Sequence, residues 1–420
     1  MKLHIILKKN KAEFFCALSL SILPIIFFWG NGVGNTLVII IDFLFLYILI
    51  KNKNLHFLNN HNFYILLFFW FILLANLIFS INLENSLDRS LGFVRYIFLI
   101  FAIQYFMRSE NKNLKYFILK SWLFFMFIIS FDLIFEIIYG SNTLGFYNLM
   151  PGRLSGFFDQ ELKIGNLYSS FYLIVLSFIL SFKLTNLRLK KKRLKKLNYK
   201  SLYFLIIFFI IISFFIGERS NFIKVIIIST LFIFFVSDKW IKSAKIISIA
   251  ILISIAVISS SKNLHWRYWD AFLRPIIHSP VQFIEKSYYI IHYKSALQVF
   301  KNHKLFGVGL KNYRKEVVKE EYPDLASIHP HQVHFEILAE LGIIGYLFFI
   351  AFFLITIFKS IKSYLETKDI FILSGLLYVT VSLIPILPSG SFFTSFGATM
   401  FWMNYAFMTM GLKELIKINK

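Results

Sequence analysis

Arginines occur in three short polar segments that separate apolar blocks of the chain. They are Arg153 in PGRLSGFFDQELKIG at 151–165, Arg219 in GERSN at 217–221 and Arg267 in HWRYWD at 265–270. Arginine presents a planar fork that binds phosphate oxygens in pairs, and it stays charged at any relevant pH. Several arginines on one face would suit a pyrophosphate, although each one alone would equally suit contact with lipid headgroups.

Histidines gather in a fourth segment, SIHPHQVHFEILAELGIIG at 327–345. It carries His329, His331 and His334, and His292 lies upstream. A histidine that works as a general base needs reach and a pKa near neutrality, a condition that is easily met. His331 and His334 also permit a facial pair of metal ligands, but no carboxylate or cysteine completes a closed set beside them. We therefore expect a base and no metal, and the metal alternative stays open.

The rest of the chain must position these residues at a membrane. Of 420 residues, 58% are hydrophobic and 16% are charged, and the mean hydropathy is +0.68. The apolar residues form blocks of roughly 15 to 25, close to the length that a helix needs to cross a hydrocarbon core about 30 Å thick. This balance excludes an ordinary cytosolic enzyme and a disordered chain, and the single cysteine, Cys16, excludes a disulfide scaffold.

The apolar blocks predict an all-α, polytopic membrane protein with about twelve transmembrane helices. The spans are expected at 13–29, 32–50, 63–80, 91–107, 116–139, 165–182, 201–216, 222–237, 246–260, 333–358, 370–388 and 392–411. Residues 1–260 would hold spans one to nine, residues 261–332 one large loop, and residues 333–420 spans ten to twelve.

The net charge of +23 is mainly a signal of orientation. Residues 183–200 carry nine lysines or arginines and no acid, so the positive-inside rule predicts a cytoplasmic loop. Counting spans from there places both termini in the cytoplasm, and the arginine segments and the loop 261–332 outside. A basic connection between two spans, without interleaved aromatics, indicates anionic membrane lipids as partners and no nucleic acid.

The loop 261–332 is too long to be structureless and is expected to contain helices. A helix over Ile284–Asn302 would place one set of side chains on a common face. That set is Ile284, Tyr288, Ile291, Ser295 and Val299. A turn punctuated by glycines at 307 and 309 then leads to Arg314.

Span ten is expected to begin inside the histidine segment. Pro330 suits the first position of a helix, whose first turn would carry His331 and His334. The helix is expected to run straight into the membrane. A histidine in that place would sit at the external surface, where lipid-bound substrates present their headgroups.

The histidine segment resembles the hallmark of the O-antigen ligase and polymerase superfamily. That hallmark is a histidine, then Asn, Ser or Gln, then a glycine eleven residues beyond the histidine, opening the span after the large periplasmic loop. Here the three positions are His331, Gln332 and Gly342. The stretch HYKSALQVFKNHKLFGVGLKNYR is similar to the family's loop segment, with Tyr313–Arg314 as its aromatic–arginine pair, and RLSGFFDQELKIG and GERSNF resemble two further external arginine sites.

The chain departs from the family pattern at two places. Phe335 stands where leucine is usual, and Tyr288–Tyr289 stands near the place where many members carry an arginine. The role of that arginine therefore cannot be assigned to an arginine in this chain, and His292 is the nearby candidate for a related role.

The resemblance implies a glycosyltransferase of the O-antigen ligase type in the bacterial inner membrane, with its active site on the periplasmic face. The donor would be a glycan on undecaprenyl pyrophosphate and the acceptor a lipid A-core or similar glycan, without ATP, nucleotide sugar or other cofactor. The catalytic residues would be His331 as base and Arg219 and Arg153 as pyrophosphate clamp. Substrate-binding roles would fall to Arg314, Arg267, His292 and Gln332.

Two other functions remain open at this point. An O-antigen polymerase would use the same donor and extend the glycan on its own carrier. A twelve-span transporter or flippase would bind its substrate near the bilayer midplane, whereas the charged residues inside the predicted spans lie near span ends. A receptor or scaffold would find little docking surface on the short cytoplasmic loops.

Overall fold

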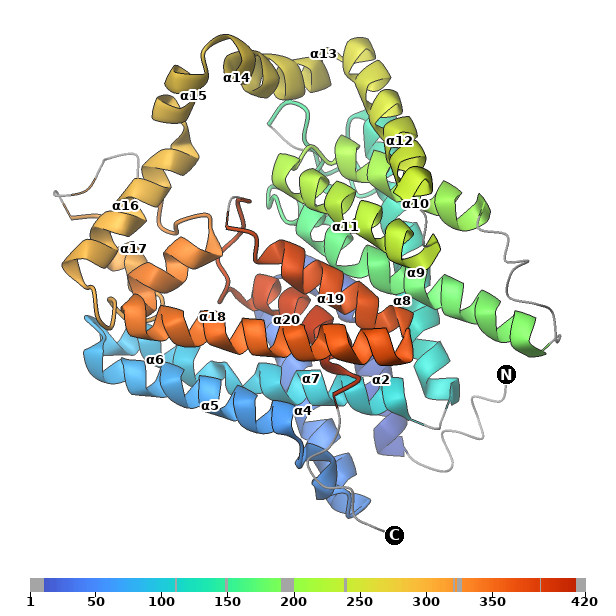
Figure 1. The fold of residues 1–420 in the computed structure, drawn as a ribbon, viewed down its shortest axis with the longest axis vertical. Helices are drawn as coiled ribbons and strands as arrows, with labels where there is room; N and C mark the ends of the chain where they lie inside the picture. Colours follow the sequence, from blue (N-terminus) through green and yellow to red (C-terminus); the bar gives the residue numbers. More distant parts are fainter. Residues whose placement is uncertain are drawn as a thin grey trace.

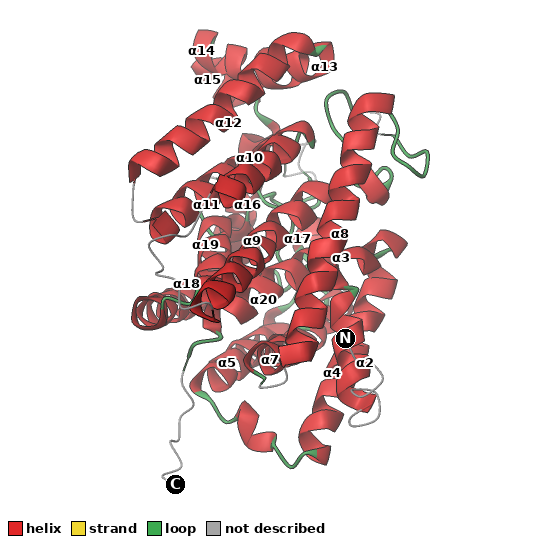
Figure 2. Cartoon of the chain, turned by 90° about the vertical axis from the view of Figure 1, so that its right-hand side faces the viewer, coloured by secondary structure: helices red, strands yellow, loops and turns green. Residues whose placement is uncertain are grey.

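The fold of the described residues consists of helices and connecting loops (Figures 1 and 2). The computed structural model describes residues 11–109, 112–147, 150–189, 200–237, 240–319, 322, 327–385 and 387–412. The first half contains α2 (Lys11–Ser21), α3 (Leu23–Ile26), η1 (Phe27–Trp29), α4 (Asn31–Lys51), η2 (Leu55–Leu58), α5 (His61–Ala75), η3 (Asn76–Phe79), α6 (Leu83–Gly92), α7 (Val94–Arg108), α8 (Lys112–Tyr139), η4 (Gly156–Phe158) and α9 (Ile164–Leu189). The second half contains α10 (Lys200–Phe215), α11 (Arg219–Ser237), α12 (Trp240–Ser260), α13 (Lys262–Leu264), η6 (His265–Leu273), α14 (Arg274–His278), α15 (Pro280–Lys286), α16 (Tyr288–Asn302), α17 (Tyr313–Glu316), α18 (Val333–Thr367), α19 (Ile370–Ser382) and α20 (Ser395–Thr409).

Each predicted span coincides with one to three of these helices, but the lengths differ. Among the described residues, eight helices are long and apolar enough to cross a membrane, and the pair Lys11–Ser21 and Leu23–Trp29, bent by 49°, would make a ninth. The other predicted spans are α10, α19 and α20, with 16, 13 and 15 residues. The all-helical class is confirmed, whereas a total of twelve spans stays a prediction. Most of the basic run 183–200, at 190–199, lies outside the described residues.

The two shortest of these helices are the ones that other helices surround. α20 packs against α19, α7 and α9 in the middle of the bundle (Figure 1). Every residue from Ala398 to Thr409 is buried. Polar groups on α20 bond to neighbouring helices: Asn404 Nδ2 donates to the Ser170 carbonyl at 3.0 Å, and Gln104 Nε2 donates to Thr409 Oγ1 at 3.0 Å. A helix covered by protein needs no continuous lipid-facing apolar surface, so its length is free of the usual constraint.

Residues 262–302 form an arch of short helices from the end of α12 to α16 (Figure 1). The expected helices in the 261–332 loop are thus present. η6 is a π-helix, a rare form that is frequent at functional sites. It buries Arg267 and Tyr268 and leaves Trp266 and Trp269 largely exposed.

The predicted face of the helix at 284–302 is wrong at its first two positions. Ser287 has an extended backbone (ψ 123°), which separates α15 from α16, so Ile284 does not share a helix with Val299. Ile284 and Tyr288 are exposed, and the buried face of α16 contains His292, Ser295, Ala296 and Val299.

α18 starts later than the sequence predicted. Gln332 is its N-cap, and Gln332 Oε1 accepts hydrogen bonds from the backbone N–H groups of His334 at 2.6 Å and Phe335 at 3.1 Å. Because this cap satisfies the first free N–H groups, the helix begins at Val333. The prediction that Pro330 begins the helix with His331 in its first turn is therefore wrong, and His331 lies in the loop before the cap.

α18 is also broken at Gly342 (φ 65°, ψ −169°), where it was expected to run straight. The break receives the turn at 304–309. Val308 and Gly309 donate their N–H groups to the carbonyls of Ala339 at 3.0 Å and Glu340 at 2.8 Å. On the other side of the break, Ile343 and Ile344 donate to the carbonyls of Lys304 at 2.8 Å and Leu305 at 3.2 Å. The loop thus satisfies backbone groups that the break sets free.

Candidate active site

A cavity of about 1360 Å³ lies between the arch and the adjoining helix ends. Among the described residues that line it are six lysines or arginines and two carboxylates. The cations are Arg153, Lys163, Arg219, Lys224, Arg267 and Arg274, and the carboxylates are Glu218 and Asp270. Aromatic rings, including Phe272, Phe283, Tyr288 and Tyr289, complete much of the wall. Positive excess beside apolar surface suits a ligand with an anionic group and an apolar part.

The three arginine segments meet at a close crossing of two backbones. Gly217 has a φ of +75°, and a Cβ there would lie 2.0 Å from the Gly152 carbonyl oxygen. A Cβ on Gly152 would lie 2.7 Å from the Asn263 carbonyl oxygen and 3.1 Å from the Arg267 side chain. Glycine is required at both places because only a residue without Cβ permits this approach. The crossing brings Arg153, Arg219 and Arg267 onto one cavity.

Each of the three guanidinium groups is held by a different contact. Arg153 Nη2 forms an ion pair with Glu218 Oε1 at 2.9 Å. Arg219 stacks over the Phe272 ring, with 4.8 Å from its guanidinium carbon to the ring centroid, and Nη1 lies 3.4 Å from the Ala271 carbonyl. Arg267 Nε donates to the Gly217 carbonyl at 2.5 Å. Burial, and then the charges of Arg153 and Arg219, lower the pKa of Arg267 to about 10, as expected for cations crowded together.

The loop that carries Arg153 is held by two carboxylates on α8. Glu136 Oε1 accepts from the N–H of Ser155 at 2.8 Å, and Oε2 accepts from the N–H of Gly156 at 2.8 Å. One turn earlier, Asp132 Oδ1 accepts from the N–H of Thr143 at 2.9 Å. Hydrogen bonds to a carboxylate are stronger than neutral ones. Two charged residues near the end of a predicted span thus act as ties for an external loop.

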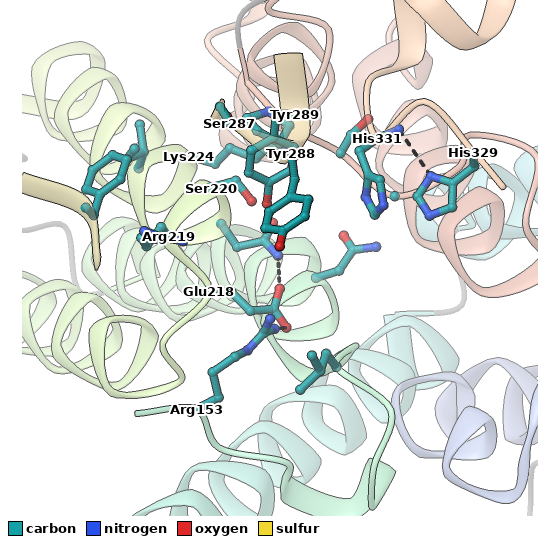
Figure 3. A pocket seen from close by; sticks show the side chains of 18 of the residues that line it. Arg153, Glu218, Arg219, Ser220, Lys224, Ser287, Tyr288, Tyr289, His329 and His331 are labelled. Atoms are coloured by element: carbon teal, nitrogen blue, oxygen red, sulfur yellow. Dashed lines mark hydrogen bonds and ion pairs between the residues drawn. The ribbon is translucent and has the colours of Figure 1, made fainter. Parts of the chain in front are cut away.

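His331 occupies a strained backbone conformation at the edge of the same cavity. Its φ is +54°, a conformation that costs a residue with a Cβ about 1 kcal/mol. Residues with such strained backbones cluster at functional sites. Its carbonyl accepts from Ser389 N–H at 2.8 Å, and its N–H donates to His329 Nδ1 at 3.2 Å. The ring of His292 stacks on the ring of His331, with centroids 5.1 Å apart. Figure 3 shows the labelled histidines and the labelled arginines on different sides, with Tyr288 between them.

The histidine cluster has low proton affinity. Burial, with smaller contributions from His329 and His292, lowers the pKa of His331 to about 3. Burial, and then the charges of His292 and Arg314, lower the pKa of His329 to about 4. Both rings are therefore neutral near pH 7, and each has one unprotonated nitrogen that can accept a hydrogen bond or a proton. In the described part of the chain, no group of three or more His, Cys, Asp or Glu side chains has the arrangement of a metal site.

Not all predicted site residues reach the cavity. Arg153, Arg219, Arg267 and His331 line it. Gln332 caps α18, and His292 accepts from Ser327 N–H at 3.1 Å behind His331.

Arg314 lines a second, much smaller cavity of about 10 Å³. It shares that cavity with Arg89 and with the carboxylates Glu336 and Glu340. His329 and Ser391 line both cavities, so the two adjoin.

Sequence reasoning missed three contributors to the cavity. Glu218 stands beside Arg219 in GERSN, and the adjacency of opposite charges between two apolar blocks was the available signal. Lys224 lines the cavity from within α11, where only the fold shows which way it points. The segment 388–397 also lines it, although 392–397 was assigned to a predicted span; the serines, threonine and glycines of PSGSFFTSFG were the available signal.

The fold and the cavity define a class: an all-helical membrane protein with an arginine-lined cavity beside a histidine and under an arch of short helices. Comparison with known families narrows this class. Residues 201–350 match the family described as O-antigen ligase, and this match supports the resemblance to the O-antigen ligase and polymerase superfamily. The matched range includes Arg219, Arg267 and His331 but not Arg153. A search of curated proteins finds no match to the chain.

Proposed function

We propose that the chain is a membrane glycosyltransferase of the O-antigen ligase type. It would move a glycan from undecaprenyl pyrophosphate to a lipid A-core or similar acceptor. The observation that carries this proposal is the convergence of Arg153, Arg219 and Arg267 on a cavity that His331 also lines. The family match supports the same reaction class.

The reaction couples one bond that forms with one that breaks. The acceptor hydroxyl oxygen attacks the anomeric carbon of the donor glycan, and the bond from that carbon to the pyrophosphate oxygen breaks. The electron pair of the broken bond stays on the departing pyrophosphate, where negative charge grows. Cations that meet this charge most strongly in the transition state lower the barrier, which is the role proposed for Arg153 and Arg219 with Arg267 beside them.

The acceptor proton goes to His331 and then to water. A pKa of about 3 makes His331 a weak base before the donor binds. A pyrophosphate in the cavity would raise that pKa, because a nearby negative charge favours the protonated ring. Donor binding would thereby prepare the base at the moment when it is needed.

The proposed reaction sets the topology. The cavity would face the periplasm, both termini the cytoplasm, and the helices would form twelve spans in the inner membrane. Many of the residues that line the cavity come from the segments predicted outside, at 151–165, 217–221, 261–332 and 389–391, and others come from the start of the predicted span 392–411.

Two alanine variants test the site. His331→Ala and Arg219→Ala should each abolish glycan transfer while the protein inserts and accumulates normally. Lys294→Ala and His56→Ala are matched controls, because these exposed side chains lie outside the cavity lining, and they should retain transfer. Full activity in both site variants would refute the assignment.

Deletion of the gene separates ligase from polymerase. A ligase predicts loss of every glycan-bearing lipopolysaccharide band on a gel, with lipid-linked polymer still accumulating. Lipopolysaccharide capped with single glycan units would indicate a polymerase instead.

A further inference from the structure

Glu218 is a buried carboxylate within the most basic part of the cavity wall. It is 9% exposed, and Arg153 beside it is 13% exposed. Glu218 Oε1 contacts Arg153 Nη2 at 2.9 Å and accepts from the Gly165 N–H at 3.3 Å, and Oε2 accepts from Asn221 Nδ2. Both Glu218 and Arg153 line the cavity. The carboxylate of Glu218 therefore pairs with the same guanidinium, that of Arg153, to which an incoming anion would bind.

The surroundings are built to hold a carboxylate in this place. A Cβ on Gly165 would lie 2.6 Å from Glu218 Oε2, so glycine at the start of α9 makes the room that Glu218 fills. Of the three arginines at the crossing, Arg153 alone has a carboxylate partner among the described residues; Arg219 and Arg267 contact backbone carbonyls. Among these three arginines, Arg219 and Arg267 thus carry charge that no described carboxylate pairs with, whereas Glu218 neutralises Arg153. Lys163, Lys224 and Arg274 add further cations to the cavity wall.

We propose that Glu218 is an exchangeable counter-ion for Arg153. The inference rests on the proposed function, because the exchanging anion is the pyrophosphate of the lipid carrier. Before pyrophosphate binds, the carboxylate positions the guanidinium fork of Arg153. When pyrophosphate enters, its oxygens take over or share that fork, and when the pyrophosphate product leaves, the carboxylate closes on Arg153 again.

This exchange has a consequence opposite to that of a purely structural residue. A carboxylate that competes with pyrophosphate weakens retention of the product, so Glu218 promotes release. A residue that only supports the fold would give weaker pyrophosphate binding when it is changed. The sign of the change in pyrophosphate affinity therefore distinguishes the two roles.

The test measures binding of inorganic pyrophosphate to the purified full-length protein by titration calorimetry. Glu218→Gln keeps the shape and removes the charge, and it should bind pyrophosphate roughly tenfold more tightly than the native chain, the size expected for loss of one member of a close charge pair. In Glu218→Gln, multiple-turnover transfer should be slower than single-turnover transfer by a larger factor than in the native chain, because release of the pyrophosphate product is slower. Equal or weaker binding in Glu218→Gln would overturn the proposal.

Asp270→Asn is the matched control. Asp270 is the other carboxylate that lines the cavity, and its partners are His265 at 3.1 Å and Arg274 at 3.5 Å instead of Arg153. It therefore makes the same change of charge without freeing Arg153. A gain in affinity as large as that of Glu218→Gln would overturn the exchange at Arg153. In the double variant Arg153→Ala, Glu218→Gln, the gain should disappear.

Two further results keep the inference separate from the proposed function. If neither the native chain nor Glu218→Gln binds pyrophosphate, the anion site and the counter-ion both fail. If both bind it equally, only the counter-ion fails. If Glu218→Gln does not fold, Glu218→Asp replaces it, because aspartate keeps the charge but shortens the reach to Arg153. A two- to threefold gain in pyrophosphate affinity would support the exchange, and a loss of affinity would overturn it.

Discussion

Gly342 offers the sharpest test of how the fold builds the site. An alanine there must adopt φ 65° and ψ −169°, a region that essentially only glycine occupies, at a cost of about 2 kcal/mol. The new Cβ would also lie 2.4 Å from the Leu305 carbonyl oxygen, so one of the two backbones must shift. Four backbone hydrogen bonds join 304–309 to 339–344. At about 1 kcal/mol each, loss of half of them adds about 2 kcal/mol.

The Gly342→Ala variant should therefore lose about 4 kcal/mol of folding free energy, together with the position of the turn at 304–309. We expect the melting temperature in detergent, followed by tryptophan fluorescence, to drop by roughly 5 °C. Gly32→Ala is the control, because a Cβ there meets no atom within 4 Å and its helical backbone favours alanine. Equal melting temperatures and transfer rates in the two variants would refute the reasoning.

Three other predictions concern the cavity. Glu136→Ala leaves the N–H groups of Ser155 and Gly156 without their acceptor, so glycan transfer in a single-turnover assay should fall at least about tenfold. Transfer by Glu136→Gln should fall less, because its amide oxygen still accepts one of these bonds. Arg153→Lys should weaken pyrophosphate binding about tenfold in a titration, because an ammonium lacks the planar fork whose parallel N–H donors bind two oxygens in a fixed geometry; native-like binding would exclude Arg153 from the clamp. The pKa of His329, lowered to about 4 by burial, lies below its unfolded value, so protons bind the unfolded chain preferentially and the melting temperature should fall as pH drops from about 6.5 to about 4. His329→Gln should show a shallower fall, and an identical pH profile would contradict the assigned burial.

The sequence predicted helices where apolar blocks occur, because a backbone in lipid must satisfy its own hydrogen bonds. It did not predict how long they are, since α19 and α20 are enclosed by protein and escape the demand for a membrane-spanning length. The arginines were predicted to converge, and three of them line one cavity. Arg314 was grouped with them, but it lines the second, smaller cavity. The position of Arg314 depends on tertiary contacts between the turn at 304–309 and the break in α18, which the sequence does not reveal. Glu218 was passed over because the sequence does not reveal that Gly165 leaves room for its carboxylate.

The crossing at Gly152 and Gly217 limits how the protein can be recombined with its relatives. Arg267 belongs to the loop 261–332, but the carbonyl that fixes its Nε belongs to Gly217, and its side chain passes against Gly152. A chimera that receives this loop alone would place a foreign side chain against the native crossing. Grafting of this loop between family members therefore needs three segments moved together: 151–156, 216–221 and 261–332. A graft that moves all three segments should keep the relative positions of Arg153, Arg219 and Arg267. A graft that moves only one or two of them should fail to form the cavity.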